Sequence, residues 1–462
     1  MWSLAVPPLG LSYIDECLSR AGFVVSVRDY NVILHKKFIQ DKGLKAAGLN
    51  DIWNGGYALE WEMDNTFLQN ILPQVKDYLV FAVSDILDWV KNEQLEAIGF
   101  SLFGTNSHAT RFVCYQLKKA NPKLKLFVGG AQTFNYPWRH EVLNGLVDAC
   151  VTGKGEISCV ELIKAWSQND FESPIDGVLR RGSNRDFIPY RPRPLLNLAD
   201  LPVVSHGKLY DWGQIPIQMS RGCVALCSFC DQVRFWEKFR YRKPEDIFEE
   251  MKSNSERLGI KLFLVMDSLL NGHHKNFVIL AQLLKDANLG ILYGGNSRID
   301  KRLTKDVIQL LRESGCVHLT FGLESGSQRI LDKMRKGIRL EWAVYNLKLC
   351  TETGIAVNLN LIAGFPGEEE EDFDLTIKFL KDNRHNYTSV STGMGMGIGM
   401  HTEVFDRPKK YGIRTNPDGS VWYGPEGRET EDGRNNLAVR MNRLKKVRAM
   451  LKNYDITYWP AE

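Results

Sequence analysis

The sequence has no long hydrophobic run and no strong excess of charge of one sign. No stretch of 18 or more apolar residues is free of charge, and the best candidate, Leu79–Val90, contains Asp85 and Asp88, so we expect no membrane-spanning helix. The N-terminal segment has neither a basic region nor a long apolar core, which argues against a secretory signal peptide. Lysine and arginine number 59 against 55 aspartate and glutamate, a net charge of +4. This balance does not predict binding to nucleic acid or to a membrane surface.

Cysteine is also sparse, with nine in 462 residues. A small and odd number argues against a disulfide framework and favours a reducing compartment, so we expect a cytoplasmic protein. Six cysteines are scattered, and the four in the first half of the chain have no spacing typical of a ligand set, so we interpret them as small buried hydrophobic residues. These four are Cys17, Cys114, Cys150 and Cys159. The other three, Cys223, Cys227 and Cys230, fall within eight residues.

Strands alternate with helices in the first third of the chain. Short apolar runs bounded by turn residues predict strands, and apolar residues at helical spacing predict helices. The predicted strands are residues 23–30, 95–103, 123–131 and 147–153, and the predicted helices are 9–22, 74–92, 107–120, 138–146 and 156–166. This alternation predicts an α/β domain, residues 1–166, with a parallel sheet covered on both faces. Residues 167–212, rich in Pro, Arg and Gly, are interpreted as a linker with a short hairpin near Val178.

Six further strand and helix units follow the linker. The predicted strands are 215–220, 261–267, 290–297, 317–324, 356–365 and 388–395, with helices between them. Six such units predict a partial (β/α)6 barrel of the TIM type over residues 213–396, with its chemistry at the carboxyl ends of the strands. Residues 397–462 form a small C-terminal extension that ends in a helix with six basic residues. We interpret these basic residues as a solvent-facing surface, with an acidic partner as the alternative.

The segment SRGCVALCSFC, residues 220–230, places three cysteines just beyond the first strand of the barrel. Thiolates are ligands for zinc and for iron–sulfur clusters. A structural zinc site needs four ligands, usually in two pairs, and the nearest histidines are not at that spacing. A 4Fe–4S cluster held by three thiolates leaves one iron open to a substrate. The spacing therefore favours an open 4Fe–4S cluster, and zinc remains the alternative.

The CxxxCxxC spacing, with Phe229 before the third cysteine, resembles the signature of radical S-adenosylmethionine (SAM) enzymes. The resemblance implies that Cys223, Cys227 and Cys230 hold the cluster. It implies that the open iron binds SAM and that one electron cleaves SAM to a 5′-deoxyadenosyl radical. It also places the Phe229 backbone near the adenine. A flavodoxin or ferredoxin is the expected reducing partner.

Four later segments resemble the strand motifs of the same family: MDSLLN (266–271), GGNSRID (294–300), FGLESGSQRIL (321–331) and LIAGFPGEEEEDF (361–373). The resemblance implies SAM contacts at Asp267, Ser297, Arg298, Glu324, Ser325, Gly364 and Pro366. An alternative is that Arg298 and Glu324 form a structural ion pair. The acidic run Glu368–Glu371 is interpreted as a helix start, where negative charge complements the helix dipole.

The first domain resembles the Rossmann-like cobalamin-binding domain of one radical SAM subgroup. The similar pieces are residues 7–23, 98–110, 127–134 and 151–162. The resemblance implies that Ser101, Thr105, Gly129, Gly130, Gly153, Gly155 and Glu156 surround the nucleotide tail of cobalamin. No Asp-x-His-x-x-Gly motif offers a histidine to cobalt. The subgroup also has a strand before the segment that matches Pro7–Phe23, whereas only six residues precede Pro7 here.

The resemblance as a whole implies a cobalamin-dependent radical SAM enzyme, and it suggests a methyltransferase acting on an unactivated carbon of a small-molecule or peptide substrate. The expected cofactors are a 4Fe–4S cluster, SAM and cobalamin. Two alternatives stay open within the family: non-methylating radical chemistry such as cyclisation or rearrangement, and an enzyme that does not bind cobalamin. A zinc-stabilised binding protein without catalysis is the alternative of a different class.

Overall fold

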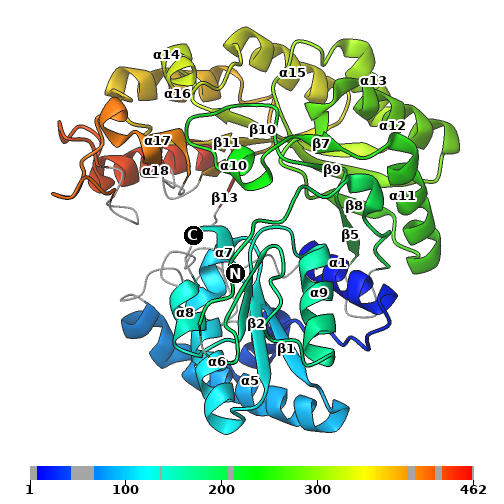
Figure 1. Ribbon diagram of the computed structural model, residues 1–462. Coiled ribbons are helices and arrows are strands. Elements are labelled where there is room, and N and C mark those ends of the chain that lie inside the picture. Colours follow the sequence, from blue (N-terminus) through cyan, green and yellow to red (C-terminus); the bar gives the residue numbers. More distant parts are fainter. Residues whose placement is uncertain are drawn as a thin grey trace. The chain divides into compact units, whose positions relative to one another are not determined.

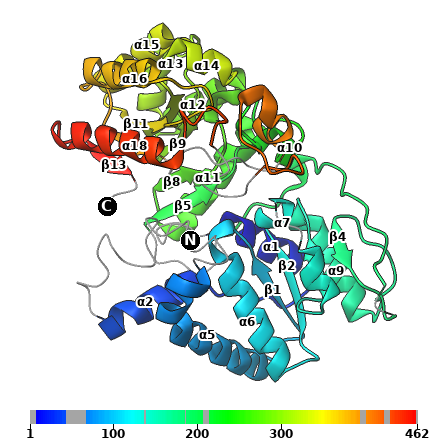
Figure 2. The same cartoon turned by 90° about the vertical axis from the view of Figure 1, so that its left-hand side faces the viewer.

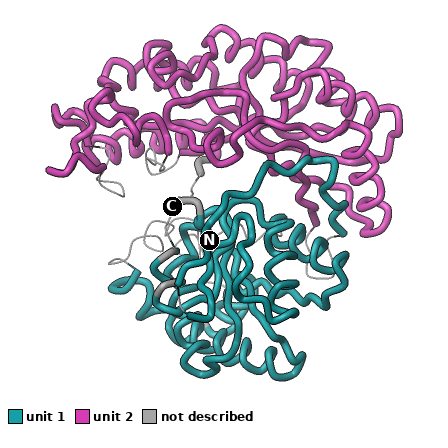
Figure 3. Tube along the Cα trace, in the orientation of Figure 1, with its two compact units in different colours: residues 1–212, 462 teal, residues 213–461 magenta. Residues whose placement is uncertain are grey.

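The computed structural model describes residues 8–42, 67–135, 138–184, 186–205, 213–392, 401–421 and 429–459. The chain divides into two compact units, residues 1–212 with 462 and residues 213–461 (Figure 3). Both are built from parallel strands and helices, so the α/β fold class predicted from the sequence is confirmed. Two groups of aromatic residues lie outside the described residues. From sequence, Trp53, Tyr57 and Trp61 are expected in the core, with a cobalamin contact as the alternative. Trp422 and Tyr423 belong to a predicted loop, residues 412–437, that is either an ordinary surface loop or a cover for the substrate.

The first unit contains a four-stranded sheet in the order β1-β2-β3-β4. Strands β1 (Ala97–Ser101), β2 (Lys125–Gly129) and β3 (Ala149–Val151) are parallel, and β4 (Val178–Arg180) pairs antiparallel to β3. β4 lies within the segment interpreted as a linker, so part of that segment is built into the sheet. The short helices around it are α7 (Gln132–Asn135), α8 (Arg139–Leu143) and η4 (Gly104–Asn106).

Helices cover both faces of this sheet (Figures 1 and 2). α5 (Leu72–Glu93), which follows η3 (Phe67–Ile71), packs against α6 (Ser107–Ala120) and α2 (Tyr30–Lys42), and α1 (Leu9–Arg20) packs against α9 (Gly155–Ser167). Alternation along β2 explains the two layers, because Leu126 and Val128 join the core under α5 and α6 while Phe127 joins the core under α9. A doubly covered sheet is the arrangement expected from apolar residues on both faces of a strand.

The expected strand at residues 23–30 is wrong. Residues 23–29 run without regular structure, and α2 begins at Tyr30. The alternating sequence FVVSVRDY favours a strand locally, but a strand exists only when its backbone groups find a neighbouring strand. Among the described residues, this segment pairs with no strand of the sheet.

The second unit contains a seven-stranded sheet in the order β13-β12-β11-β10-β9-β8-β5. All neighbours are parallel, and β5 and β13 are at the edges, so the barrel is open. The strands are β5 (Gln214–Ile217), β8 (Leu262–Val265), β9 (Leu292–Ser297), β10 (Cys316–Glu324), β11 (Ala356–Leu361), β12 (Ser389–Thr392) and β13 (Thr457–Trp459). The partial barrel of six units is confirmed, and β13, from the C-terminal extension, adds a strand that the sequence did not predict.

Helices line the outer side of this curved sheet (Figure 1). They are α11 (Pro244–Leu258), α12 (His274–Ala287), α13 (Lys305–Glu313), α14 (Gln328–Lys333), α15 (Leu340–Glu352) and α16 (Glu370–Asp382). Shorter elements and the tail comprise β6 (Ser220–Arg221), α10 (Gln232–Trp236), β7 (Arg240–Tyr241), α17 (Glu403–Asp406), η7 (Pro408–Tyr411) and α18 (Leu437–Lys452). Odd-numbered residues of β10, such as Leu319 and Phe321, are fully buried in the core beneath these helices. The even-numbered residues of β10 therefore face the inner side of the barrel.

Candidate functional site

The three cysteines lie on one loop beyond the carboxyl end of β5. β6 and β7 pair antiparallel and so close the base of the loop that contains all three residues. Cys223, Cys227 and Cys230 are each partly buried. Among the residues that the structure describes, no three His, Cys, Asp or Glu side chains converge tightly enough to hold an ion. The loop thus presents the thiols as neighbours and not as a closed metal site.

The thiols sit in a low-polarity environment with two cations nearby. Burial raises the pKa of Cys227 and of Cys230, the latter to about 12, and the neighbouring Cys223 thiol raises the pKa of both. The charges of Lys336 and Arg298 act in the opposite direction on the pKa of Cys227. Thiolate ligands need such positive charge or a metal ion to lose their protons. Lys336 therefore belongs to the site, although nothing in the sequence marked it.

Two buried polar contacts hold the cysteine loop in place. The carboxylate of Asp267, which is 1% exposed, accepts hydrogen bonds from the Met219 amide at 2.8 Å and the Ser220 hydroxyl at 2.5 Å. Farther along, the Ser228 amide and hydroxyl donate to the Met334 carbonyl at 2.9 and 3.2 Å. Asp267 was predicted to contact SAM, and its position gives it the separate task of fixing the chain that leads into the loop.

Glu324 and Lys336 form a buried ion pair across the inner face of the barrel. Their Oε1 and Nζ atoms are 2.8 Å apart, and their side chains are 9% and 11% exposed. A Cβ on Gly322 would lie 2.4 Å from Glu324 Oε1 and 2.6 Å from Lys336 Nζ, so only glycine leaves room for the pair. The alternative of an Arg298–Glu324 pair is not realised, because Arg298 donates to the Lys336 carbonyl. Lys336 also lies 5.9 Å from the ring centroid of Phe229.

Ser297 and Arg298 lie on opposite sides of β9. Strand alternation places Ser297 with the fully buried Tyr293 on the helix side, while Arg298 shares the inner side with Asn296. The hydroxyl of Ser297 is buried, and the described part of the chain gives it no hydrogen-bond partner. Asn296 is exposed on the inner side and donates to the Asp267 carbonyl at 3.2 Å. The sequence motif thus indicated the right strand but missed Asn296.

The inner face carries a row of neutral polar side chains that sequence reasoning missed. In the sheet register, Thr320 lies beside Asn296 on one side and Asn358 on the other. The Asn358 carbonyl oxygen accepts from Ser389 at 2.8 Å and Ser391 at 3.2 Å. The alternating sequence AVNLNL was the available signal, because it places asparagines on one face of β11 and apolar residues on the other.

The turn after β11 is fixed by the C-terminal extension. Gly364 has a φ of +86°, and its amide donates to Glu368 at 2.6 Å while its carbonyl accepts from Asn435 at 2.6 Å. Arg443 of α18 donates to the same Glu368 oxygen at 2.8 Å, and both of these side chains are at most 3% exposed. Asn435 and Arg443, from the C-terminal extension, thus fix the backbone of the turn at Gly364.

Two interpretations of charged segments need correction. Arg440 and Arg443 were interpreted as part of a solvent-facing surface of the last helix, but they are 0% and 2% exposed. The acidic run was interpreted only as a helix start. Glu370 does begin α16, but Glu368 is buried against Arg443, and burial raises its pKa to about 7.

The Ser325 side chain also forms hydrogen bonds within the barrel. Its hydroxyl lies 3.3 Å from that of Thr376 on α16 and accepts from the Ser327 amide at 3.1 Å. Ser327 in turn donates to Asp372 at 2.7 Å. The loop after β10 is therefore tied to α16.

In the first unit, the predicted residues gather at the carboxyl ends of β1, β2 and β3. Gly130 has a φ of +105°, and a Cβ there would lie 2.7 Å from the Leu102 carbonyl and 3.3 Å from the Ser101 hydroxyl. Gly153 has a φ of +77° with open space where its Cβ would be. The predicted set lies at these strand ends or in the turns that follow them: Ser101, Thr105, Gly129, Gly130, Gly153, Gly155 and the buried Glu156. This sheet edge is lined by backbone more than by side chains.

Comparison with known proteins identifies the second unit. Residues 217–380 match the family model of the radical SAM superfamily. The chain therefore carries a radical SAM domain. The resemblance inferred from the cysteine spacing is confirmed at this level. Within the described residues, no helix is both long and apolar enough to cross a membrane.

The curated relatives that this chain matches include a cyclase and several methyltransferases. It is 27% identical over 316 residues to the anaerobic magnesium-protoporphyrin IX monomethyl ester cyclase of Rubrivivax gelatinosus, covering 63% of this chain and 56% of the cyclase. It is 26% identical to the cytidylyl-2-hydroxyethylphosphonate methyltransferase of Streptomyces wedmorensis, covering 81% of this chain and 73% of that enzyme. The chain spans about half to two thirds of the length of this cyclase and of three other curated relatives that it matches.

Solved structures share the fold of the whole chain. The radical SAM methyltransferase TsrM from Kitasatospora setae, determined with cobalamin and a [4Fe-4S] cluster, aligns with a TM-score of 0.68 at 16% identity over 99% of this chain and 89% of TsrM. The cobalamin-dependent radical SAM enzyme OxsB aligns with a TM-score of 0.60 at 16% identity over 80% of this chain and 60% of OxsB. The predicted order of a Rossmann-like unit before a partial barrel is thus confirmed as a fold.

Proposed function

We propose that this chain is a cobalamin-dependent radical SAM enzyme that methylates an unactivated carbon. The observation that carries the proposal is the three-cysteine loop at the carboxyl ends of the barrel strands, with the buried Glu324–Lys336 pair beside it. Three thiols on one loop fit three irons of a 4Fe–4S cluster and leave the fourth for SAM. The cluster would supply the electron that cleaves SAM, and cobalamin would carry the methyl group.

The residues of the barrel hold and orient these groups. Lys336 favours the thiolate form of Cys227, which a cluster ligand requires. Glu324 and Arg298 would meet the amino and carboxylate groups of SAM, and the turn at Gly364 and Pro366 would contact the adenine. Ser325, whose hydroxyl is bonded to Thr376 and Ser327, would contribute through its backbone. Asp267 and Ser228 keep the loop in position. The neutral polar row Asn296, Thr320 and Asn358 would orient a polar, uncharged part of the substrate.

The first unit supports the cobalamin part of the proposal. Gly129, Gly130 and Gly153 leave a sheet edge without side chains, where backbone can approach a large flat ligand. Open α/β sheets bind ligands at this edge. A cradle of this kind fits cobalamin, whose nucleotide tail is expected beside Ser101 and Thr105.

The test is anaerobic incubation of purified protein with SAM, a reductant and cobalamin. Formation of both 5′-deoxyadenosine and S-adenosylhomocysteine is expected for methyl transfer. Formation of 5′-deoxyadenosine alone would overturn the methyltransferase and favour cyclisation or rearrangement, which the similarity to a cyclase also suggests. Cys227→Ala should abolish both products, whereas Cys316→Ala, in the buried core, serves as the matched control. Zinc without iron or sulfide in anaerobic protein would refute the cluster.

A further inference from the structure

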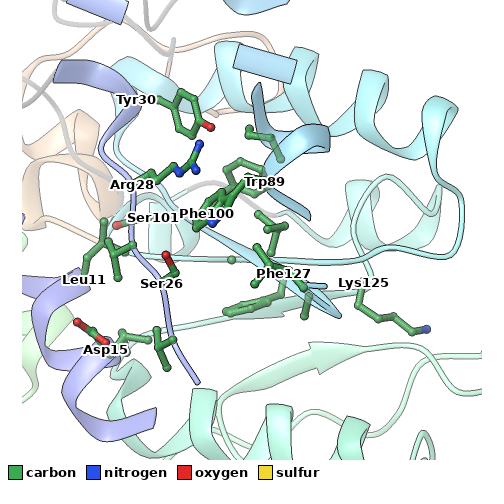
Figure 4. Close-up of a pocket in the computed structure, with 18 of the residues that line it drawn as sticks. Leu11, Asp15, Ser26, Arg28, Tyr30, Trp89, Phe100, Ser101, Lys125 and Phe127 are labelled. Carbon is green, nitrogen blue, oxygen red and sulfur yellow. The ribbon is translucent and has the colours of Figure 1, made fainter. Parts of the chain in front are cut away.

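Two features of the described chain lie outside the roles assigned above. One is a cavity of about 770 Å³ beside β1 in the first unit (Figure 4). Among the described residues, those that line it include neither a cysteine nor any of the glycines expected to meet cobalamin. Arg28, which Figure 4 shows in its wall, is bonded to Asp85 at 2.7 Å. The cavity therefore belongs to neither candidate site, whereas the second feature, a contact of α17 with the cysteine loop, adjoins the candidate cluster site.

Ser228 is the residue at which α17 meets the cysteine loop. It lies between Cys227 and Cys230 and is 1% exposed. Its amide and hydroxyl donate to the Met334 carbonyl at 2.9 and 3.2 Å, and its carbonyl accepts from the Val404 amide at 3.1 Å. Both main-chain groups and the side chain of Ser228 are thus bonded. The cysteine loop is held between the end of α14 on one side and α17 on the other.

α17 is itself fixed on the barrel. The Val404 side chain is fully buried in the core of the second unit. The Thr402 hydroxyl caps the helix by accepting from the Phe405 amide at 3.2 Å. In η7, which follows, the Tyr411 ring packs edge-on against Phe365, with 6.0 Å between the ring centroids. The extension therefore presents the Val404 amide to the cysteine loop from a defined position.

Glu403 joins α17 to the same turn of chain that accepts from Ser228. Its carboxylate accepts hydrogen bonds from Arg335 and, at 2.5 Å, from Lys410. The bonds from Lys410 and Arg335 lower the pKa of Glu403 to about 2, so the carboxylate is ionised at neutral pH. Arg335 directly follows Met334 in the sequence. The side-chain link and the two main-chain links therefore close a ring around the middle of the cysteine loop.

Arg335 occupies a backbone position that favours glycine. α14 ends in a turn where the Lys336 amide bonds to the Leu331 carbonyl at 2.9 Å, and Arg335 has a φ of +56°. Glycine is the usual residue at this place in such a turn. A larger residue is strained there and persists only where its surroundings hold it. The Arg335 side chain reaches Glu403, while its neighbours Met334 and Lys336 are directed to the cysteine loop.

We propose that α17 positions Cys227 and Cys230 to hold the cluster, and that Glu403 and Arg335 are the positioning residues that keep α17 in place. The inference rests on the proposed function, because it assumes a cluster on these thiols. Contacts behind the ligands of a metal site orient the ligands themselves. Ser228, held from both sides, limits how far the two flanking sulfur atoms can move.

The expected effect is local and small for the stability of the whole unit. Arg335 and Lys410 are about half exposed, at 50% and 53%, while Glu403 is 17% exposed. Ion pairs with exposed partners contribute little to global stability. Local opening of a loop is governed by the few contacts that close it. Substitutions in this set should therefore loosen the cysteine loop without unfolding the barrel.

Hydrogen exchange of the full chain, before a cluster is assembled, tests the link between α17 and the loop. The Ser228 and Val404 amides are the main-chain donors of this link. Glu403→Gln should speed the exchange of both amides about fivefold, because it weakens both ion pairs. The matched control is Glu313→Gln, which weakens a pair with Lys285 at 2.6 Å between α12 and α13. It should leave both amides unchanged.

Loss of iron from the reconstituted protein tests the role of α17 toward the cluster. Anaerobic protein is treated with EDTA in the absence of SAM, and the decay of the cluster absorbance is followed. Iron loss should be at least threefold faster in Glu403→Gln and in Arg335→Gly, and unchanged in Glu313→Gln. Glycine suits a φ of +56°, so the denaturant midpoint of Arg335→Gly should stay the same or rise. The double variant should lose iron no faster than Glu403→Gln, because Arg335 acts through Glu403.

The outcomes separate this inference from the proposed function. A cluster that forms and is lost at one rate in all variants would overturn the role of α17 and leave the proposed function intact. Unchanged exchange at Ser228 and Val404 in Glu403→Gln would also overturn it. A denaturant midpoint of Arg335→Gly that falls in step with faster iron loss would assign Arg335 to stability alone. Unaltered protein without iron and sulfide would refute the proposed function and, with it, any role of α17 toward a cluster.

Discussion

Different kinds of residue lie at the carboxyl ends of the strands in the two sheets. In the second unit, charged and polar side chains occupy this edge, and most are buried and bonded to one another: Asp267 to Ser220, Glu324 to Lys336, and Glu368 to Arg443. In the first unit, glycines occupy most of this edge, beside the hydroxyls of Ser101 and Thr105 and the buried Glu156. The first edge offers mainly fixed charge, and the second offers mainly exposed backbone.

Because they are built from different residues, the two sheet edges suit different ligands. A buried ion pair is held in one geometry and discriminates against ligands of the wrong charge, since an unpaired charge at such a place is costly. A glycine edge allows a large flat ligand to lie against the chain but contributes little charge. The comparison suits SAM, a compact zwitterion with a positive sulfonium, in the barrel and cobalamin in the first unit. Four substitutions test this contrast between the two sheet edges.

Lys336→Met should have the largest effect. It removes the partner of the buried Glu324 and a cation beside Cys227, so we expect stability to fall by about 3–5 kcal/mol and SAM cleavage to fall at least 100-fold. Denaturant unfolding measures the change in stability, and 5′-deoxyadenosine formation measures the change in SAM cleavage. Lys348→Met is the control, because the Lys348–Glu352 pair is 62% and 57% exposed and such pairs contribute roughly 0–1 kcal/mol. Equal effects of the two substitutions would refute the special position of Lys336.

Arg443→Met should have the next largest effect. It leaves Glu368 buried without its cation and loosens the turn at Gly364, so the KM for SAM should rise about tenfold while kcat changes less. Arg443→Lys should restore part of the affinity, because it keeps the charge but not the second donor. Lys446→Met is the control, since Lys446 pairs with Glu370 at 48% exposure. A change in kcat alone would contradict the positioning role.

Lys336 and Arg443 also show which parts of the site could not be predicted from the sequence. The cysteine loop and the strand motifs could be recognised because each is a local pattern within a dozen residues. Lys336 and Arg443 belong to no local pattern, and Arg443 meets Glu368 across 75 residues of sequence. Residues 23–30 show the opposite error, because local alternation was correct as a preference but a strand depends on a neighbour that local sequence does not reveal.

Gly130→Ala tests the glycine-lined sheet edge of the first unit. A side chain there needs a φ of +105° and would lie 2.7 Å from the Leu102 carbonyl, so the first unit should lose roughly 1–3 kcal/mol. Cobalamin affinity, measured by equilibrium dialysis, should fall several-fold, while SAM cleavage in the barrel stays unchanged. Gly10→Ala is the control, because nothing lies within 4 Å of that Cβ on α1 and alanine should stabilise the helix by about 0.5–1 kcal/mol. Loss of SAM cleavage in Gly130→Ala would contradict the assignment of SAM and cobalamin to different sheet edges.

The smallest expected effect is a slope of stability with pH. Burial raises the pKa of Glu368 from 4.5 to about 7, so the folded state keeps its proton more strongly than the unfolded chain does. The stabilising effect of that proton is full below pH 4.5 and is lost as the pH rises to about 7, by at most about 1.4 kcal/mol per unit.

Glu368→Gln should remove this negative slope from unfolding curves recorded between pH 4.5 and 7. Glu370, two residues along the chain, provides the control, because hydrogen bonds from Lys446 and Arg443 lower its pKa. The stability from Glu370 is present above its unfolded pKa of 4.5 and is lost only as the pH falls below that value, so Glu370→Gln should leave the slope between pH 4.5 and 7 unchanged. A slope that is lost in Glu368→Gln and kept in Glu370→Gln would show that burial, and not acidity of the run as a whole, distinguishes Glu368. Identical slopes in both variants would contradict the conclusion that Glu368 is the buried carboxylate that fixes the Gly364 turn.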